Sequence, residues 1–246
     1  MIRRALLRCL ALGLLAALAL QLFFVLRVAA MAWVAPESTS FERTQIWQIL
    51  RREGRLPWRQ EWAALPHISK HLQRAVIASE DDTFSQHDGM RWDALKNAWD
   101  KNAKAQARAE RQANQRPGAP APQAKVVGGS TITQQLAKNL FLSGERTLLR
   151  KGQEMLITLT LEATLSKARI LEIYLNSVEW GEGVFGAEAA ARHYFRKPAS
   201  QLNAWESARL AVMLPRPRFF EKLPQSSYLA ERSEVIMARM NSVTLP

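Results

Sequence analysis

Residues 72–89 read LQRAVIASEDDTFSQHDG, an apolar, helix-like run that ends in three adjacent carboxylates. These carboxylates belong to Glu80, Asp81 and Asp82. Each anion, together with the negative end of the helix dipole, disfavours the next negative charge, so at least one of the three should have a raised pKa. A carboxylate whose pKa lies near neutrality can serve as a general base. The alternative interpretation is a solvated acidic turn, because so short a pattern often arises without a function.

A second informative segment follows Gly129. Ser130 or Thr131 can cap a helix there, and Gln134 would complete a capping box with Thr131. The apolar side chains that follow recur every four residues and should face the core: Ile132, Leu136 and Leu140. The polar side chains fall on a neighbouring stripe: Thr131, Gln134, Gln135 and Lys138. This stripe could grip a polar ligand or form an ordinary solvent-facing surface, and the pattern alone does not decide between them.

Two cations and a carboxylate open the next predicted helix. Arg150 and Lys151 lie four and three residues before Glu154, so both can reach its carboxylate. Arginine binds phosphate as a planar fork and lysine binds it as a mobile point charge, so the pair would suit a pyrophosphate. A plain surface ion pair explains the same spacing. The helix continues apolar nearly all round, which predicts that it is central and buried.

The N-terminal segment has the composition of a membrane anchor. Residues 9–26 carry no charge, and as a helix they nearly cross a hydrocarbon core of about 30 Å. Arginines precede this run within residues 1–8, which favours an N-terminus in the cytoplasm and a body on the far side of the membrane. We therefore predict a cytoplasmic segment 1–8 and a transmembrane anchor 9–34. The alternative is a cleaved signal peptide with a cleavage site at 30–32.

Charge and cysteine content narrow the class of partner. The net charge of +12 favours anionic partners, and export across a membrane disfavours nucleic acid, so membrane-borne phosphate is the expected ligand chemistry. The single cysteine, Cys9, excludes an intramolecular disulfide. The four histidines show no metal-ligand spacing, and we predict no metal site.

The remaining chain divides by composition. Residues 35–66 form a polar connector whose tryptophans could sit at a bilayer interface or pack on the body: Trp47, Trp58 and Trp62. Residues 67–246 lack sustained alternation of apolar and polar side chains, so this domain should be mainly α-helical with short strands at most. Within it, residues 101–125 contain few large apolar side chains and several prolines, which predicts a mobile basic insert.

Taken together, the motifs of residues 67–217 resemble the family 51 glycosyltransferases, which polymerise peptidoglycan. The motifs that carry this resemblance are 80–84 with His87 and Gly89; 129–136 with Lys138 and Asn139; Arg150 and Lys151 with Glu154 and 161–162; 170–172 with 174–176; and Gly181, Gly186, 189–190 and 194–195 with Lys197. Several long motifs in a fixed order are far more specific than any one of them. The departure from the family pattern is the segment 101–125, which is longer and more basic than expected there.

The resemblance implies a fold and a setting. The fold would be mainly α-helical, a lysozyme-like glycosyltransferase domain with a smaller membrane-associated jaw lobe, preceded by one transmembrane helix. The chain leaves no room for a transpeptidase domain, so it resembles the monofunctional biosynthetic transglycosylases. The implied partners are lipid II, the lipid-linked glycan chain, the membrane and, as a further option, cell-wall synthesis or division proteins. The implied location is the bacterial inner membrane with a periplasmic catalytic domain.

The resemblance also implies roles for individual residues. Glu80 would be the general base that takes the proton from the acceptor 4-hydroxyl, which then displaces undecaprenyl pyrophosphate with inversion. The leaving pyrophosphate would be stabilised by three cations: Lys138, Arg150 and Lys151. Glu154 matches the second acidic position of the family, and could orient those cations or assist the donor. Supporting or sugar-binding roles would fall to the remaining polar residues: Asp81, Ser130, Gln135 and Asn139. No cofactor would be required, with a divalent cation at the pyrophosphate as an option.

Two rival functions stay open at this level. A hydrolase of the same polymer would also place a glutamate beside a glycan cleft. A noncatalytic, membrane-tethered scaffold for cell-wall proteins would need no base at all. The products separate the hydrolase from a polymerase, because synthesis uses a lipid-linked precursor and yields longer chains, whereas lysis consumes finished glycan. Replacement of Glu80 by glutamine separates the scaffold from a polymerase, because the nearly isosteric change should leave scaffolding intact and abolish polymerisation.

Overall fold

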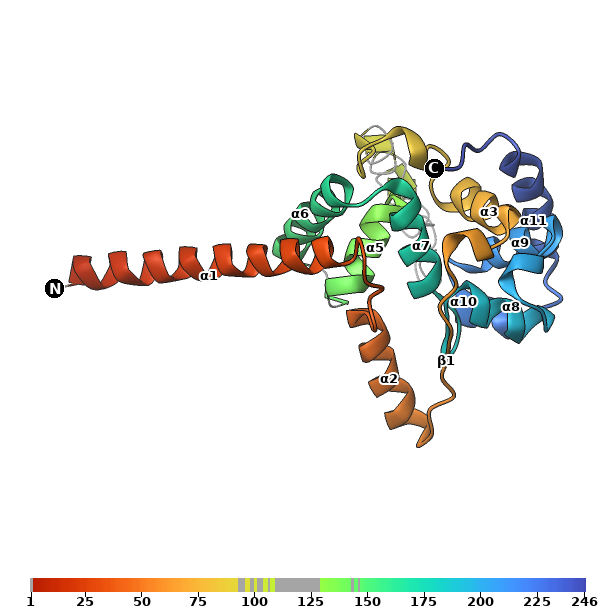
Figure 1. The fold of residues 1–246 in the computed structure, drawn as a ribbon, viewed down its shortest axis with the longest axis horizontal. Coiled ribbons are helices and arrows are strands. Elements are labelled where there is room, and N and C mark those ends of the chain that lie inside the picture. The colour runs from red at the N-terminus through yellow and green to blue at the C-terminus, as the bar shows by residue number, and fades with distance from the viewer. Residues whose placement is uncertain are drawn as a thin grey trace.

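The fold was analysed in a computed structural model that describes residues 2–92, 96–97, 100, 104–105, 107–108, 129–142, 144–145 and 147–246 (Figure 1). Most of the predicted insert 101–125 lies outside these residues, so its mobility stays a prediction. Within the described chain, helices dominate and the three strands contain two or three residues each. The predicted class, mainly α with short strands at most, is confirmed.

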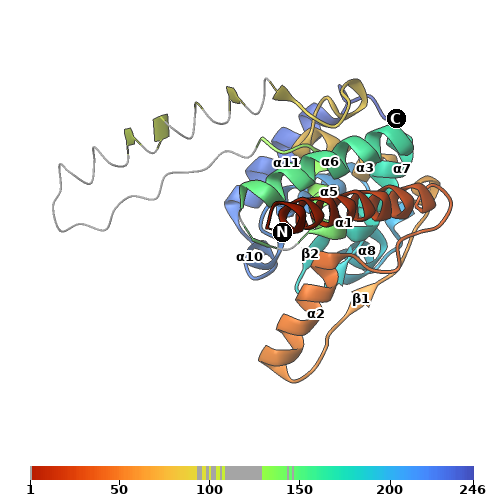
Figure 2. The same cartoon turned by 90° about the vertical axis from the view of Figure 1, so that its left-hand side faces the viewer.

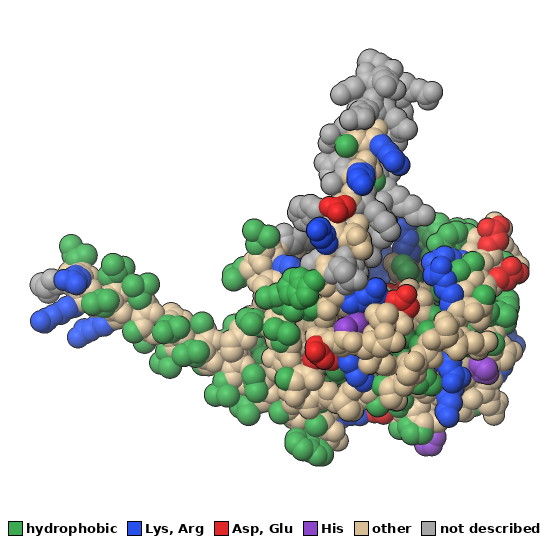
Figure 3. Space-filling view, turned by 90° about the horizontal axis from the view of Figure 1, so that it is seen from above, with side chains coloured by type: hydrophobic (Ala, Val, Ile, Leu, Met, Phe, Trp, Pro, Cys, Tyr) green, Lys and Arg blue, Asp and Glu red, His purple; other side chains and the backbone are tan. Residues whose placement is uncertain are grey.

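Helix α1 (Ile2–Ala30) projects from the body as a long apolar rod, and it is long and apolar enough to cross a membrane (Figure 1). Hydrophobic side chains cover the rod, and basic side chains gather at its outer tip (Figure 3). Its inner end is packed on the body: Phe24 and Val28 are buried, and the ring of Phe24 meets that of Phe141 edge to face at 5.2 Å. The inner end of α1 is therefore part of the folded unit.

Polar contacts also hold this inner end. Gln21 donates from Nε2 to Oε1 of Gln153 at 2.7 Å, and Arg169 donates from Nε to the carbonyl oxygen of Met31 at 2.7 Å. The side chain of Met31 is buried. Met31 lies in the segment 30–32 that a signal peptidase would have to reach, so this packing favours a retained helix over a cleaved signal peptide.

Residues 35–66, predicted to be a connector, contain regular structure that joins the body. Helix α2 (Ser40–Glu53) begins with a capping box between Thr39 and Glu42. Strand β1 (Arg59–Gln60) pairs in parallel with β3 (Val184–Phe185), which pairs antiparallel with β2 (Glu179–Gly181). The domain boundary at 66 stays a prediction, but these residues complete the three-stranded sheet and do not merely link two parts.

The three tryptophans of this segment lie in different environments. Trp58 stacks on Phe185 with ring centroids 4.5 Å apart, and Trp62 packs partly buried against the core. Trp47 is largely exposed on α2. Packing on the body therefore accounts for Trp58 and Trp62, while Trp47 is free to contact another surface.

One helical layer consists of α3 (Lys70–Glu80), α9 (Ala204–Met213) and α11 (Ser227–Met240), which pack on one another (Figure 1). The apolar run quoted above forms the buried face of α3, and Glu80 is its last residue. Asp81 ends the helix. The remaining short elements of the body complete this side: η1 (Leu65–His67), η2 (Phe84–Gln86), α8 (Ala187–Phe195), η3 (Ala199–Gln201) and α10 (Pro217–Glu221).

The second layer consists of α5 (Ile132–Phe141), α6 (Leu148–Thr164) and α7 (Lys167–Ser177), with α1 lying against α6 (Figure 2). Helix α5 starts at Thr131 with the predicted capping box to Gln134. Its predicted core residues are all buried: Ile132, Leu136 and Leu140. The sequence therefore located both the start and the inner face of this helix.

The prediction that α6 is central and buried is wrong for one of its faces. Only one face packs inward, through Ile157, Thr158 and Leu161. The opposite face exposes a row of apolar side chains: Leu148, Leu149, Met155, Leu156 and Leu159. The physical reason is the position of α6 at the edge of the body beside the apolar rod of α1, so its apolar circumference meets two different surroundings.

Glycine is required at the turn between β2 and β3. Gly183 has a φ of +71°, and an added Cβ there would lie 2.0 Å from the carbonyl oxygen of Pro57. Asn176, at the end of α7, accepts from the backbone N–H of Ala63 and donates to its carbonyl oxygen, both at 2.8 Å. These contacts tie the segment 35–66 to α7 and the turn.

Candidate active site

Glu80 lies at the end of α3 with its side chain facing α5. Gln135 donates from Nε2 to Oε2 of Glu80 at 2.8 Å. Burial raises the pKa of the Glu80 carboxyl above its ordinary value; the hydrogen bond from Gln135 and the positive charge of Lys138 lower it, and the negative charge of Asp81 raises it. The expected raised pKa is confirmed at Glu80, but the expected main cause is wrong, because burial outweighs the neighbouring charge.

Asp81 is buried and its oxygens are occupied by protein groups. His87 lies 2.9 Å from Oδ1 through Nε2, and the backbone N–H of Ile132 donates to Oδ2 at 3.1 Å. The Nδ1 atom of His87 accepts from the backbone N–H of Gly89, so the proton of a neutral imidazole is on Nε2 and points at Asp81. Asp81 was expected either to support other site residues or to bind a sugar, and these contacts fit the supporting role. They join the end of α3 to the start of α5.

Tyr174 completes the surroundings of Glu80 and was assigned no role from the sequence. Its hydroxyl donates to Oε1 of Gln135 at 2.9 Å. Only 1% of Tyr174 is exposed, and this burial raises its pKa well above the ordinary value, so the hydroxyl stays protonated. Because the tyrosine hydroxyl engages Oε1, the amide of Gln135 presents its NH₂ group to Glu80. The residue belongs to the recognised motif 174–176, which was the available signal.

The second acidic position, Glu154, is bound by two cations. It is 4% exposed and accepts from Nη1 of Arg150 at 3.0 Å and from Nζ of Lys151. The Nε atom of Arg150 is buried and has no hydrogen-bond partner among the described residues. Two cations share one buried carboxylate here, so the cluster keeps a net positive charge.

Lys138 lies between the two acidic positions. Its side chain is exposed at the surface, yet partial removal of its ammonium from water lowers its pKa. The negative charges of Glu154 and Glu80 both oppose this shift. Arg150 and Lys151 add to the lowering. The charges at both acidic positions therefore act on Lys138. It follows Gln135 by three residues on α5, so the two side chains lie near the same face of that helix.

A pocket of about 240 Å³ opens beside this cluster. Its lining joins α5, the start of α6 and α2: Phe41, Lys138, Asn139, Leu142, Gly144, Glu145 and Arg150. The structure therefore brings Lys138, Arg150 and Asn139 to one cavity. Ser130 is exposed before α5, makes no hydrogen bond to another described residue and is not in the lining of this cavity.

A third polar cluster supports the loop after Glu80. Thr133 donates to Oε1 of Glu162 at 2.5 Å, and Lys167 pairs with Glu162 at 2.8 Å and donates to the carbonyl oxygen of His87. An added Cβ at Gly89 would lie 2.7 Å from the Cγ atom of Glu162. This close approach explains why residue 89 is a glycine. It also shows that the loop after Glu80 packs directly against α6 and the start of α7. Among the described residues, no group of three or more His, Cys, Asp or Glu could hold a metal ion.

The mostly helical fold, with a partly buried glutamate at one helix end and a cation cluster on the neighbouring helices, is that of a lysozyme-like glycosyltransferase. The family model described as Transglycosylase matches residues 48–241. The chain belongs to this transglycosylase family.

Relatives named "Biosynthetic peptidoglycan transglycosylase" match nearly the whole chain. Those from Burkholderia orbicola (strain MC0-3) and Burkholderia ambifaria (strain MC40-6) are each 51% identical over 229 residues, which cover 93% of this chain and 86% of the relative. The relative from Burkholderia thailandensis is 50% identical over 229 residues, covering 93% of this chain and 83% of its own. The resemblance drawn from the motifs is therefore confirmed at the level of the family.

Proposed function

We propose that this protein is a peptidoglycan glycosyltransferase that polymerises lipid II into linear glycan strands and releases undecaprenyl pyrophosphate. The names of the relatives support the polymer class. The observation that carries the proposal is the arrangement along α5, where Gln135 holds Glu80 and Lys138, three residues on, joins the cations around Glu154. One helix thus links a base to a site for a negatively charged leaving group.

Glu80 is the base in this proposal. It takes the proton from the 4-hydroxyl of the acceptor GlcNAc, whose oxygen attacks the anomeric carbon of the donor MurNAc. The bond from that carbon to the pyrophosphate oxygen breaks, and the configuration inverts in a single displacement. The raised pKa of Glu80 supports this role, because a carboxylate with a higher pKa takes up a proton more readily in the transition state.

Lys138, Arg150 and Lys151 stabilise the pyrophosphate as it leaves. Fixed cations lower the barrier because they are already oriented where negative charge develops. The two roles considered for Glu154 were orienting the cations and assisting the donor. Its contacts support the first, since both of its oxygens accept from cations. No cofactor is required in this proposal, and a divalent cation at the pyrophosphate stays an option.

The setting is a membrane. The apolar helix α1 is consistent with a single-pass anchor, and the exposed leucines of α6 lie on the helix that α1 packs against. We propose that the N-terminus is cytoplasmic, that the body faces the periplasm, and that the outer face of α6 meets the lipid. The lipid chain of a substrate could then stay in the bilayer while its pyrophosphate reaches the cation cluster.

The test is incubation of the purified full-length protein with labelled lipid II in detergent, with products resolved on a gel and digested with a muramidase. Wild-type protein should form polymer that collapses to disaccharide units, and Glu80→Gln should lose about a thousandfold in rate. The matched control is Asp82→Asn, because Asp82 is exposed and pairs only with Arg91 among side chains of the described chain. Polymer from Glu80→Gln at the wild-type rate would refute the base; no polymer from folded wild type would favour a hydrolase or scaffold.

A further inference from the structure

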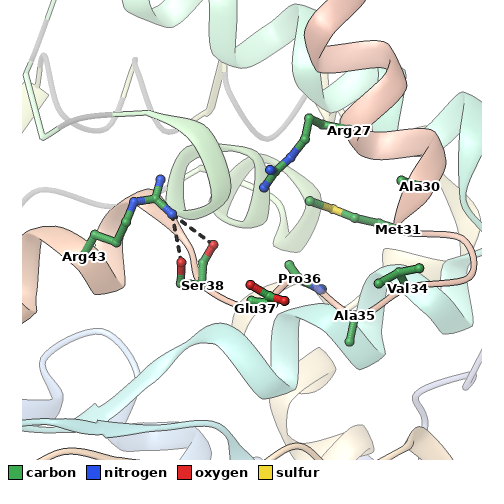
Figure 4. Close-up of a pocket in the computed structure, with 9 residues that line it drawn as sticks. All are labelled: Arg27, Ala30, Met31, Val34, Ala35, Pro36, Glu37, Ser38 and Arg43. Atoms are coloured by element: carbon green, nitrogen blue, oxygen red, sulfur yellow. Dashed lines mark hydrogen bonds between the residues drawn. The ribbon is translucent and has the colours of Figure 1, made fainter.

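A pocket of about 400 Å³ lies where α1 ends and the chain turns toward α2 (Figure 4). It is separate from the lining of the cation pocket, although α2 contributes to both, through Phe41 to one and Arg43 to the other. Neither the base nor the cations of the proposed reaction line it. A polar pocket at this junction has no role in the chemistry described so far.

The charges around this junction pocket form a pattern. Arg27 reaches into it from α1 and Arg43 from α2, and Glu37 adds a carboxylate from the loop that joins the two helices (Figure 4). Arg43 donates from Nη1 to the hydroxyl of Ser38 at 3.0 Å and to its carbonyl oxygen at 3.2 Å, which orients the guanidinium. Arg27 has no ion pair with any described residue. Two cations and one anion therefore face a common space.

The walls of the junction pocket are held from outside. On one side, the buried capping box of Thr39 and Glu42 fixes the start of α2, and Gln60 donates to the second oxygen of Glu42 at 3.0 Å. On the other side, Arg169 holds the carbonyl oxygen of Met31. These contacts fix the backbone on both sides of the pocket, which reduces the ordering that binding would require.

The level of the pocket relative to a bilayer follows from the sequence. Arg27 is the first charged residue after the uncharged run 9–26. If α1 spans a bilayer, the end of that run lies at the boundary between hydrocarbon and headgroups. Arg27 and the adjoining loop are then level with the lipid phosphates, whichever way the anchor is oriented. Phosphate groups are therefore the anions that this pocket meets at the highest local concentration.

We propose that the junction pocket binds the phosphate-bearing headgroup of a membrane lipid. Arg27 and Arg43 hold the phosphate through charge-assisted hydrogen bonds, which guanidinium groups form as planar forks. Glu37 accepts from the ammonium of a zwitterionic headgroup, so phosphoethanolamine matches the two cations and the anion better than a headgroup without an amine. This inference rests on the proposed membrane anchoring and not on the proposed reaction.

The experiment measures binding of short-chain phosphatidylethanolamine to the full-length protein in detergent by native mass spectrometry, without lipid II. Phosphatidylglycerol of the same chain length and a mixture of inorganic phosphate with ethanolamine are the comparison probes. We expect Arg27→Gln and Arg43→Gln each to weaken phosphatidylethanolamine binding about tenfold. Glu37→Gln should remove the preference over phosphatidylglycerol. The matched control is Arg55→Gln, an exposed arginine beyond the end of α2 and outside the lining.

Three results would overturn the inference. Undiminished lipid binding by the Arg27→Gln, Arg43→Gln double variant would show that these arginines hold no headgroup. Equal affinity for inorganic phosphate would identify a site for soluble anions, and equal affinity for both lipids in the wild type would remove the role of Glu37. All variants change exposed side chains, and a melting temperature equal to that of the wild type confirms folding. If Glu80→Gln still polymerises lipid II, the proposed reaction fails while this site stands.

Discussion

Glu80 and Glu154 are the two acidic positions of the candidate site, but the regions around them supply different partners. In the region between α3 and α5, Glu80 accepts from the neutral amide of Gln135. In the region of α6, Glu154 accepts from two cations. A carboxylate with a neutral partner keeps its full negative charge toward a substrate, whereas a carboxylate that accepts from two cations positions them. In the proposed reaction, this contrast separates the base, Glu80, from the carboxylate that positions the cations, Glu154.

The strongest test of this contrast is Glu154→Gln. The variant leaves Arg150 and Lys151 without their shared anion, so we expect kcat/KM for lipid II to fall about a hundredfold through misplaced cations. Glu234→Gln, an exposed glutamate on α11, is the matched control. If Glu154→Gln instead abolished a pH-dependent ionisation and left substrate affinity intact, Glu154 would be a second proton carrier and the contrast would fail.

The next test concerns Gln135. Its hydrogen bond favours the ionised form of Glu80, so Gln135→Met should raise the pKa of Glu80 still further. Since the base works ionised, the rate falls as pH falls through that pKa, and the acid limb of the pH–rate profile should move to higher pH. At neutral pH we expect about a tenfold loss of rate.

Tyr174→Phe should shift the same limb in the same direction by less, because Gln135 remains but its amide is no longer oriented. Tyr228→Phe, which changes an exposed tyrosine on α11, is the control. A merely structural role for Tyr174 would lower the melting temperature and leave the position of the limb unchanged.

Helix α1 contacts α6 next to Glu154, because Gln21 donates to Gln153, the residue immediately before Glu154. Gln21→Leu removes a hydrogen bond between helices worth about 1 kcal/mol, so the inner end of α1 should detach about fivefold more often. Limited proteolysis of the full-length protein in detergent, followed at the loop 31–38, measures this. Leu20→Met, an exposed neighbour on α1, is the control. Equal cleavage rates in Gln21→Leu and wild type would show that apolar packing alone holds the anchor.

The smallest expected effect is on stability. A carboxyl whose pKa is raised by folding stabilises the folded state while it is protonated, and this contribution is lost as pH rises through the folded pKa. Glutamine lacks that dependence. At neutral pH, Glu80→Gln should therefore melt above the wild type by a few degrees at most, and the difference should vanish at a pH below the ordinary glutamate pKa. A lower melting temperature at neutral pH would mean that Glu80 stabilises the fold as an anion.

Local rules predicted much of the fold. The end of α3 at Glu80 and the capping box at Thr131 follow from side-chain periodicity and helix-end chemistry, which depend on residues three or four positions apart. The burial of α6 did not follow, because its apolar residues look the same in sequence whether they face the core or the outer surface. The pairing of β1 with β3 also escaped prediction, since strands of two residues show no period.

The site was predictable in its charges and not in its contacts. Glu80, Lys138 and Glu154 stand out by type and spacing. The placement of Tyr174 against Gln135 joins α7 to α5, a separation that no local pattern encodes. Burial is likewise a property of the packed molecule, which is why the reason for the raised pKa of Glu80 was misjudged from three neighbouring carboxylates.

If α1 spans a bilayer as proposed, its packed inner end has a consequence for the position of the body over the membrane. Phe24, Val28 and Met31 are buried against the body, so α1 cannot swing freely about a flexible joint. A membrane-spanning helix accommodates a change in hydrocarbon thickness by changing its tilt. If α1 tilts as a unit with the body, bilayer thickness sets the angle and height at which the catalytic groups stand over the membrane surface. Lipid chain length then becomes a variable of glycan synthesis, independent of headgroup chemistry.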